Sequence, residues 1–272
     1  KGLAFSSNVG ICELLANYIN YNQFSDYLDK FGFFQHVDTP YVDQSLGVKN
    51  IGLPTDYLST GFGQASSITA LQLCQAYTAI FNDGTMVRPY VIDSIVDSDT
   101  GNVIKKYKKK AVGTPISAQT AKEVQELMSH VTDDGASGER FKVDGIDLLM
   151  KTGTGQIYNQ DQGQYDEYYH TSSIMAAAPA DDPKVMVYYG LVSTNITGYS
   201  AEPFKKIMRD TIQTYGISTN PTNETQDAYE SWETYKMPSL VNHTVDYAYE
   251  KMKDKKVHYE VIGDGNSVTS QY

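Results

Sequence analysis

The chain has 272 residues, enough for one large domain and one small one, and 40% of its residues are apolar. Its formal net charge of −11 argues against a nucleic-acid partner, which would need a basic face, and against a polybasic grip on an anionic membrane. It contains no run of about 18 apolar residues, so no membrane-spanning segment is predicted.

Residues 1–131 are predicted to be mainly helical. Apolar side chains recur there at helical spacing in several segments bounded by capping or turn residues. These segments are 9–20, 24–31, 68–81 and, after a Ser117 cap, 121–131. Residues 34–60 are rich in glycine and proline, and irregular structure is expected there. Residues 86–107 are predicted to form a hairpin that turns at Asp99-Thr100-Gly101-Asn102.

From residue 143 onward, strand patterns replace the helical ones. The apolar, β-rich segments are 143–152, 171–178 and 184–193. The polar stretch 156–169 is predicted to be a long loop, and an amphipathic helix follows over 204–212. Because the strands are grouped together and flanked by helices, the sequence predicts an α+β fold with an antiparallel sheet.

Residues 217–235 are polar and lack periodicity, which predicts a linker between a domain at 1–216 and a small unit at 236–272. A helix over 245–252 and a strand over 257–262 are expected in that unit. It has too few residues for an independent core.

The most informative motif is Lys151-Thr152-Gly153-Thr154-Gly155, which follows an apolar run that ends at Met150. Lysine supplies charge, threonine supplies hydrogen-bond donors, and glycine lets a ligand lie against bare backbone. These residue types at the end of a strand predict a ledge that binds a carboxylate.

A second candidate motif, Ser6-Ser7-Asn8, precedes the first predicted helix. Ser and Asn commonly cap helices, so a capping role and a chemical role are both open. The S-x-N pattern recurs at 193–195, where a predicted strand ends, and at 218–220, in the predicted linker. Only the first copy combines a loop hydroxyl and an amide with a K-T-G segment far downstream.

Further motifs are Gly61-Phe62-Gly63-Gln64, Ile68-Thr69-Ala70-Leu71-Gln72-Leu73, Asn82-Asp83-Gly84 and Arg88-Pro89. Together with the two motifs above, in this order and spacing, they resemble the C-terminal part of a class B, division-type penicillin-binding protein, a peptidoglycan D,D-transpeptidase. The likeness covers roughly residues 1–216. Residues 236–272 resemble the start of a PASTA repeat, carried by Met237-Pro238, by 261–265 and by 268–271.

The resemblance implies a penicillin-binding/serine β-lactamase-like transpeptidase fold, incomplete at its N-terminal side. That fold has a five-stranded antiparallel sheet with helices on both sides. It also implies roles for the site residues. Ser6 relays a proton toward the leaving amine, and Asn8 binds the substrate amide. Lys151 and Thr152-Gly153-Thr154 hold the terminal carboxylate of a stem peptide or β-lactam, and a backbone N–H near Thr154 completes the oxyanion hole.

The chain departs from the family in one respect: no serine is followed by lysine three residues later, so the S-x-x-K nucleophile motif is absent. We expect the nucleophile on an N-terminal portion of the same protein, and this chain alone to be inactive. The resemblance further implies anchoring at the outer face of the cytoplasmic membrane of a Gram-positive-type bacterium, through a segment not in this chain. Divisome proteins are candidate partners.

Alternatives remain open from the sequence. One is a non-catalytic peptidoglycan-binding or divisome scaffold of the same fold, and another is a β-lactamase or carboxypeptidase. The scattered histidines give no metal-ligand spacing, and neither a metal nor a cofactor is expected. Two interpretations are open for the tyrosines of the predicted loop: they line a substrate groove, or they belong to a flexible polar segment. These residues are Tyr158, Tyr165, Tyr168 and Tyr169.

Overall fold

The computed structural model describes residues 1–159, 163–194, 200–217, 238–253 and 265–269, which belong to two compact units, 1–221 and 222–272. The elements of the first unit are α1 (Asn8–Asn17), α2 (Tyr21–Lys30), α3 (Pro54–Gly61), α4 (Ala70–Phe81), β1 (Met86–Val87), β2 (Ser94–Val96), β3 (Val103–Lys106), β4 (Ala111–Gly113), α5 (Ala118–Ser129), η1 (His130–Thr132), η2 (Glu139–Phe141), β5 (Leu149–Asn159), β6 (Gln164–Ala178), β7 (Val185–Ser193) and α6 (Glu202–Thr214). None of the helices in these ranges is long and apolar enough to cross a bilayer.

The main sheet is an antiparallel meander in the order β5-β6-β7. Its strands follow one another directly and helices flank them, so the predicted α+β class is confirmed. The family resemblance implies five strands, and the described residues of this chain contribute three.

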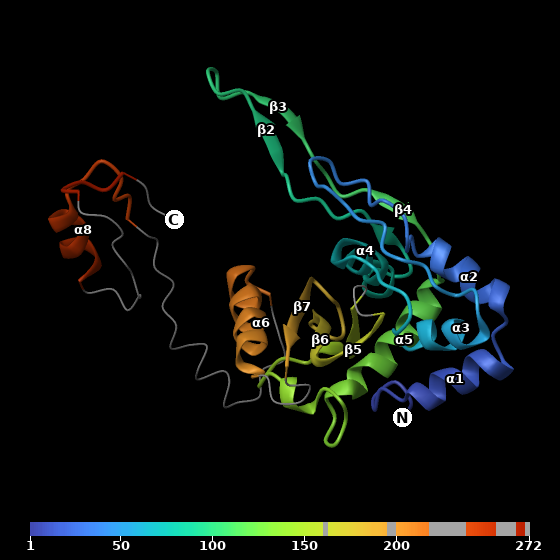
Figure 1. The fold of residues 1–272 in the computed structure, drawn as a ribbon. Helices are drawn as coiled ribbons and strands as arrows, with labels where there is room; N and C mark the ends of the chain where they lie inside the picture. Colours follow the sequence, from blue (N-terminus) through green and yellow to red (C-terminus); the bar gives the residue numbers. More distant parts are fainter. Residues whose placement is uncertain (160–162, 195–199, 218–237, 254–264, 270–272) are drawn as a thin grey trace. The chain divides into compact units, whose positions relative to one another are not determined.

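Both faces of the sheet are covered near the start of β5, which explains the unbroken apolar run at 148–150. On one face, Met150 and Ile174 pack with Phe204 of α6. On the other, Leu149 and Ala177 pack with residues of α4 and α5. Figure 1 shows α6 on one side of the sheet and α4 and α5 on the other. A strand buried on both faces has no polar positions to alternate with.

Several predicted segments differ in the structure. The strand predicted over 143–152 is β5, which begins at Leu149 and not at residue 143, because Val143 and Ile146 pair with each other in an isolated bridge across a tight turn. The segment 34–60, expected to be irregular, contains all of helix α3 except its last residue. Its sequence signal is Pro54 at the first helical position with Asp56 in the first turn, both favourable at a helix N-terminus.

The prediction of a long loop at 156–169 is wrong. Strand β5 continues to Asn159 and β6 begins at Gln164. The aromatic rings of Tyr158 and Tyr165 pack edge to face across the two strands, with centroids 5.5 Å apart. Aromatic cross-strand pairs stabilise sheets whose other side chains are polar, so composition alone mispredicted this segment.

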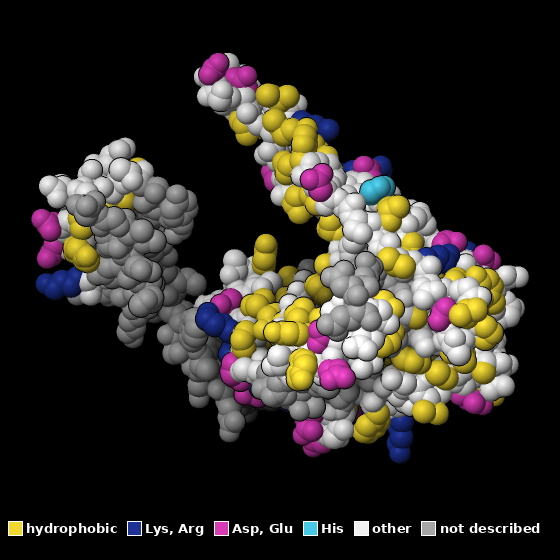
Figure 2. All heavy atoms as spheres, viewed as in Figure 1, with side chains coloured by type: hydrophobic (Ala, Val, Ile, Leu, Met, Phe, Trp, Pro, Cys, Tyr) yellow, Lys and Arg dark blue, Asp and Glu magenta, His cyan; other side chains and the backbone are white. Residues whose placement is uncertain are grey.

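The hairpin predicted at 86–107 is present as β2 and β3, and its turn is organised by the Asp97 carboxylate, which accepts the Thr100 N–H at 2.7 Å. The flanking β1 pairs with β4 instead. Figure 2 shows hydrophobic side chains along the β2–β3 hairpin and acidic ones at its tip. Val103 and Ile104 stay exposed because a two-stranded ribbon has no second layer to cover them.

The second unit contains the predicted helix as α8 (Val245–Met252), capped by Thr244, which also bridges to Ser267. A small cluster of Leu240, Ala248 and Met252 packs with Val268. The predicted strand 257–262, and the linker 217–235 apart from its first residue, lie outside the described residues. Met237 and residues 261–264, 270 and 271 of the PASTA resemblance lie outside them too.

Gly84 turns the chain between α4 and β1 with a φ of +81°. A Cβ at this position would lie 2.2 Å from the Ile116 carbonyl oxygen, so a substitution here tests the packing. Gly101 has a similar φ of +72° but open space around it. We expect Gly101→Ala to lower the free energy of unfolding by about 1–2 kcal/mol through backbone strain alone. Gly84→Ala should cost at least about 1 kcal/mol more because of the added clash. Urea unfolding of both variants measures the difference, and equal losses would contradict the packing.

Candidate active site

The K-T-G residues occupy the first half of β5, an edge strand of the described sheet. Gly153 pairs with Ser173, and a Cβ at Gly153 would lie 2.7 Å from the Ser173 hydroxyl, so a side chain there would clash. The outer edge of β5 has no strand partner among the described residues. Its backbone N–H and C=O groups are therefore placed to pair with an extended ligand.

Ser6 lies in the loop before α1 with a left-handed backbone, φ 52°, a conformation that costs energy and often occurs at functional sites. The neighbouring Ser7 caps α1, because its hydroxyl accepts the Gly10 N–H at 3.1 Å. The capping role that the sequence left open belongs to Ser7. The Ser6 hydroxyl faces Lys151 instead.

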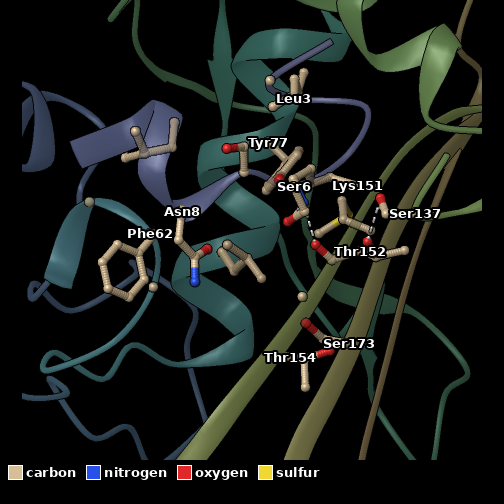
Figure 3. Close-up of a pocket in the computed structure, with 18 of the residues that line it drawn as sticks. Leu3, Ser6, Asn8, Phe62, Tyr77, Ser137, Lys151, Thr152, Thr154 and Ser173 are labelled. Carbon is tan, nitrogen blue, oxygen red and sulfur yellow. Dashed lines mark hydrogen bonds between the residues drawn. The ribbon is translucent and has the colours of Figure 1, made fainter. Parts of the chain in front are cut away.

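The Lys151 ammonium donates hydrogen bonds to the Ser6 hydroxyl at 2.7 Å and to the Thr152 carbonyl at 2.5 Å (Figure 3). The first contact joins residues 145 positions apart. Burial lowers the pKa of Lys151 from its usual value, because removal from water disfavours the charged form. Such a lysine exchanges a proton with a neighbouring hydroxyl more readily than a solvated one.

All six predicted site residues line one cavity of about 910 Å³; they are Ser6, Asn8, Lys151, Thr152, Gly153 and Thr154. In Figure 3, Asn8 and Phe62 lie across the open space from Thr154 and Ser173. The fold thus brings a loop hydroxyl, an amide, an ammonium and a strand edge to one space. These groups can bind a carboxylate and move a proton.

Several cavity residues were missed by sequence analysis. Ser137 accepts a hydrogen bond from the Thr152 hydroxyl at 3.1 Å, which holds that side chain beside the cavity. Ser173 reaches the site through its register with Gly153. Tyr77, from α4, has its pKa raised to about 12 by burial. No local sequence pattern marks any of these three residues as part of a site, because tertiary packing brings each of them to the cavity.

Residues 1–213 match the family model of the penicillin binding protein transpeptidase domain. The chain belongs to this family. Its sequence is 28% identical over 278 residues to stage V sporulation protein D of Bacillus subtilis, covering 98% of this chain and 42% of that protein. It is 29% identical over 221 residues to the probable peptidoglycan D,D-transpeptidase PenA of Neisseria gonorrhoeae, covering 78% of this chain and 36% of that protein.

The fold is also similar to solved structures of penicillin-binding proteins. Penicillin-binding protein 3 of Mycobacterium tuberculosis, complexed with ampicillin, superposes with a TM-score of 0.72 at 26% identity, covering 82% of this chain and 52% of that one. Penicillin-binding protein 2X of Streptococcus thermophilus has a TM-score of 0.63 at 23% identity, covering 99% and 41%, which supports the fold alone. The chain spans less than half the length of the two curated relatives named above.

The Ser6 contact makes a prediction about Lys151. Ser6→Ala should lower the pKa of Lys151 further, because it removes an acceptor that stabilises the ammonium. The pH dependence of lysine acetylation by a trace reagent, followed by peptide mass spectrometry of the complete protein, reports this pKa. Lys122, exposed on α5, serves as the internal reference. If the Lys151 midpoint is the same in both proteins, the hydroxyl does not act on the ammonium.

Proposed function

We propose that this chain is the C-terminal part of a serine D,D-transpeptidase that cross-links peptidoglycan stem peptides, with its nucleophile on an N-terminal portion of the same protein. The observation that carries the proposal is the 2.7 Å contact between Lys151 Nζ and Ser6 Oγ on the wall of the cavity. A binding module needs a charge for the carboxylate, but it does not need a hydroxyl hydrogen-bonded to a partly buried ammonium.

The proposed reaction is acyl transfer. The nucleophilic serine attacks the penultimate D-alanine carbonyl, the bond to the terminal D-alanine breaks, and the serine proton ends on the departing amine. Ser6, with Lys151 beside it, passes that proton. An amine of a second stem peptide then attacks the ester, loses a proton to the same group, and releases the serine. Asn8 lies across the cavity, where it can bind the substrate amide.

Substrate binding would use the free edge of β5. Lys151 contributes positive charge to the terminal carboxylate, and the Thr154 hydroxyl contributes a donor. Thr152 is fixed by Ser137, and its neighbour Gly153 leaves the backbone accessible. A backbone N–H near Thr154 would stabilise the oxyanion. β-lactams would enter as substrate mimics, a use supported by the ampicillin complex of the mycobacterial relative.

The nucleophile would come from the missing S-x-x-K segment. The 272 residues contain no such motif, and the curated relatives are more than twice as long as their matched parts. The cavity beside Ser6 and Lys151 has an apolar wall that includes Leu73, Tyr77 and Met175. Such a wall suits an apolar segment of protein better than solvent.

The setting of the complete protein follows from the same proposal. It would be anchored by an N-terminal segment at the outer face of the cytoplasmic membrane of a Gram-positive-type bacterium. There it would meet stem peptides, β-lactams and divisome proteins. Domain limits of 1–216 and 236–272, joined by a linker, would place a partial PASTA module after the catalytic domain. The cluster of Leu240, Ala248, Met252 and Val268 supports a small folded unit there.

Acylation kinetics test the proposal. In the complete protein, Lys151→Ala should raise the barrier to acylation by benzylpenicillin by about 2 kcal/mol, or about 30-fold in rate, because a charge-assisted contact to the carboxylate is lost. Lys122→Ala, on the exposed face of α5, is the matched control and should acylate at the wild-type rate. Equal rates in both variants would remove Lys151 from the site. Absence of acylation in the wild type would favour the non-catalytic scaffold.

A further inference from the structure

Four exposed tyrosines belong to the outer part of the β5–β6 hairpin, and the proposed reaction does not use them. Tyr158 is 54% exposed, Tyr165 39%, Tyr168 71% and Tyr169 49%. Large aromatic side chains that stay exposed together on an ordered element form a surface suited to binding. Tyrosine suits a wet binding surface because its ring is apolar and its hydroxyl forms hydrogen bonds.

The strand pairing fixes part of this surface. Tyr158 of β5 lies opposite Tyr165 of β6, and their rings pack edge to face with an interplanar angle of 82°. The contact holds the two rings in a defined arrangement. A fixed pair loses little side-chain freedom when a ligand binds, which favours affinity.

The other two tyrosines belong to a bulge in β6. The register passes from Gln156 opposite His170 to Tyr158 opposite Tyr165, so residues 166–169 of β6 face a single residue of β5. The Asp166 carboxylate accepts the N–H groups of Tyr168 and Tyr169, each at 2.8 Å. Both bonds lower the pKa of the Asp166 carboxyl, and the bond from the Tyr169 N–H has the larger effect. Asp166 is thus a positioning residue that holds the bulge in one shape.

The tyrosines lie on the path that a bound peptide would take. The start of β5 is buried between apolar layers, where Leu149 and Met150 are 2% and 0% exposed. An extended peptide whose carboxylate sits at Lys151 to Thr154, and which pairs with the edge of β5 away from this buried start, would run toward Tyr158. Tyr158 lies four residues beyond Thr154, about 14 Å along the strand. An extended stem peptide of about five residues spans about 17 Å, so its sugar-linked end would reach the tyrosines.

The loop after α3 lies on the other side of this path, facing β5. A Cβ at Gly155 would lie 3.5 Å from Gln64 Nε2, so the loop after α3 approaches β5 at this position. Phe62 of the same loop lines the cavity. The absence of a side chain at Gly155 leaves room for Gln64 to approach the strand there.

We propose that the tyrosine platform, formed by Tyr158, Tyr165, Tyr168 and Tyr169, binds the N-acetylated glycan strand that carries the stem peptide. The assignment to this substrate rests on the proposed function. The carbon–hydrogen faces of pyranose rings pack on aromatic rings by dispersion, and the tyrosine hydroxyls can bond sugar hydroxyl and acetamido groups. A largely uncharged saccharide is also compatible with a chain whose net charge is −11, which would repel an acidic polymer.

The first test measures saccharide binding directly. Tetra-N-acetylchitotetraose should bind the complete protein saturably in saturation-transfer NMR, with transfer from tyrosine ring protons. Tyr158→Ala and Tyr168→Ala together should weaken binding by about tenfold or more, because stacking surface is lost. Tyr158→Phe with Tyr168→Phe should retain most of it, since the rings remain. Tyr215→Ala, at the end of α6 with 72% exposure, is the matched control and should bind normally.

The second test asks whether the platform continues the catalytic groove. A disaccharide-pentapeptide should slow benzylpenicillin acylation at a lower concentration than the free pentapeptide does. The double alanine variant should lose that advantage while its acylation in the absence of competitor is unchanged. Equal inhibition by the two ligands in the wild type, or no saccharide binding, would overturn the inference. Saccharide binding in a protein that benzylpenicillin fails to acylate would refute the proposed function but uphold the platform.

Discussion

The hydrogen bond between Lys151 Nζ and Ser6 Oγ joins the first loop of the larger unit to its main sheet, and the arrangement of the site depends on it. Lys151 is fixed by the sheet, while Ser6 belongs to a loop with no sheet to hold it. That loop is fixed by the Ser7 cap on α1 and by the bond from the Ser137 N–H to the Ala4 carbonyl at 3.0 Å. Because Ser137 also holds Thr152, one segment aligns both motifs.

The local environment gives this contact its chemistry. β5 begins between two apolar layers, and the strand carries Lys151 from that dry region to the cavity wall. Partial burial destabilises the ammonium, and the two oxygens it meets partly offset that cost. A solvated lysine would bind a carboxylate weakly and hold its proton firmly. The apolar packing behind β5 is therefore part of the site.

Periodic, locally encoded features could be predicted from the sequence. Helix α5 with its Ser117 cap and helix α6 follow the 3.6-residue pattern, and the K-T-G segment was located on a strand. Features that depend on pairing between distant segments could not. The polar residues 156–159 and 164–169 belong to strands because Tyr158 packs on Tyr165, and Ser173 enters the site only through the register of β6. The family resemblance supplied the roles proposed for Ser6 and Asn8, which spacing alone left open.

The most direct test of the account locates the covalent adduct. The complete protein is acylated with benzylpenicillin, digested, and analysed by peptide mass spectrometry. The proposed mechanism predicts one adduct, on a serine followed three residues later by lysine, outside the 272 residues of this chain. An adduct on any residue of this chain, Ser6 and Ser137 included, would contradict it, because the group assigned to move a proton or to position Thr152 would then be the nucleophile.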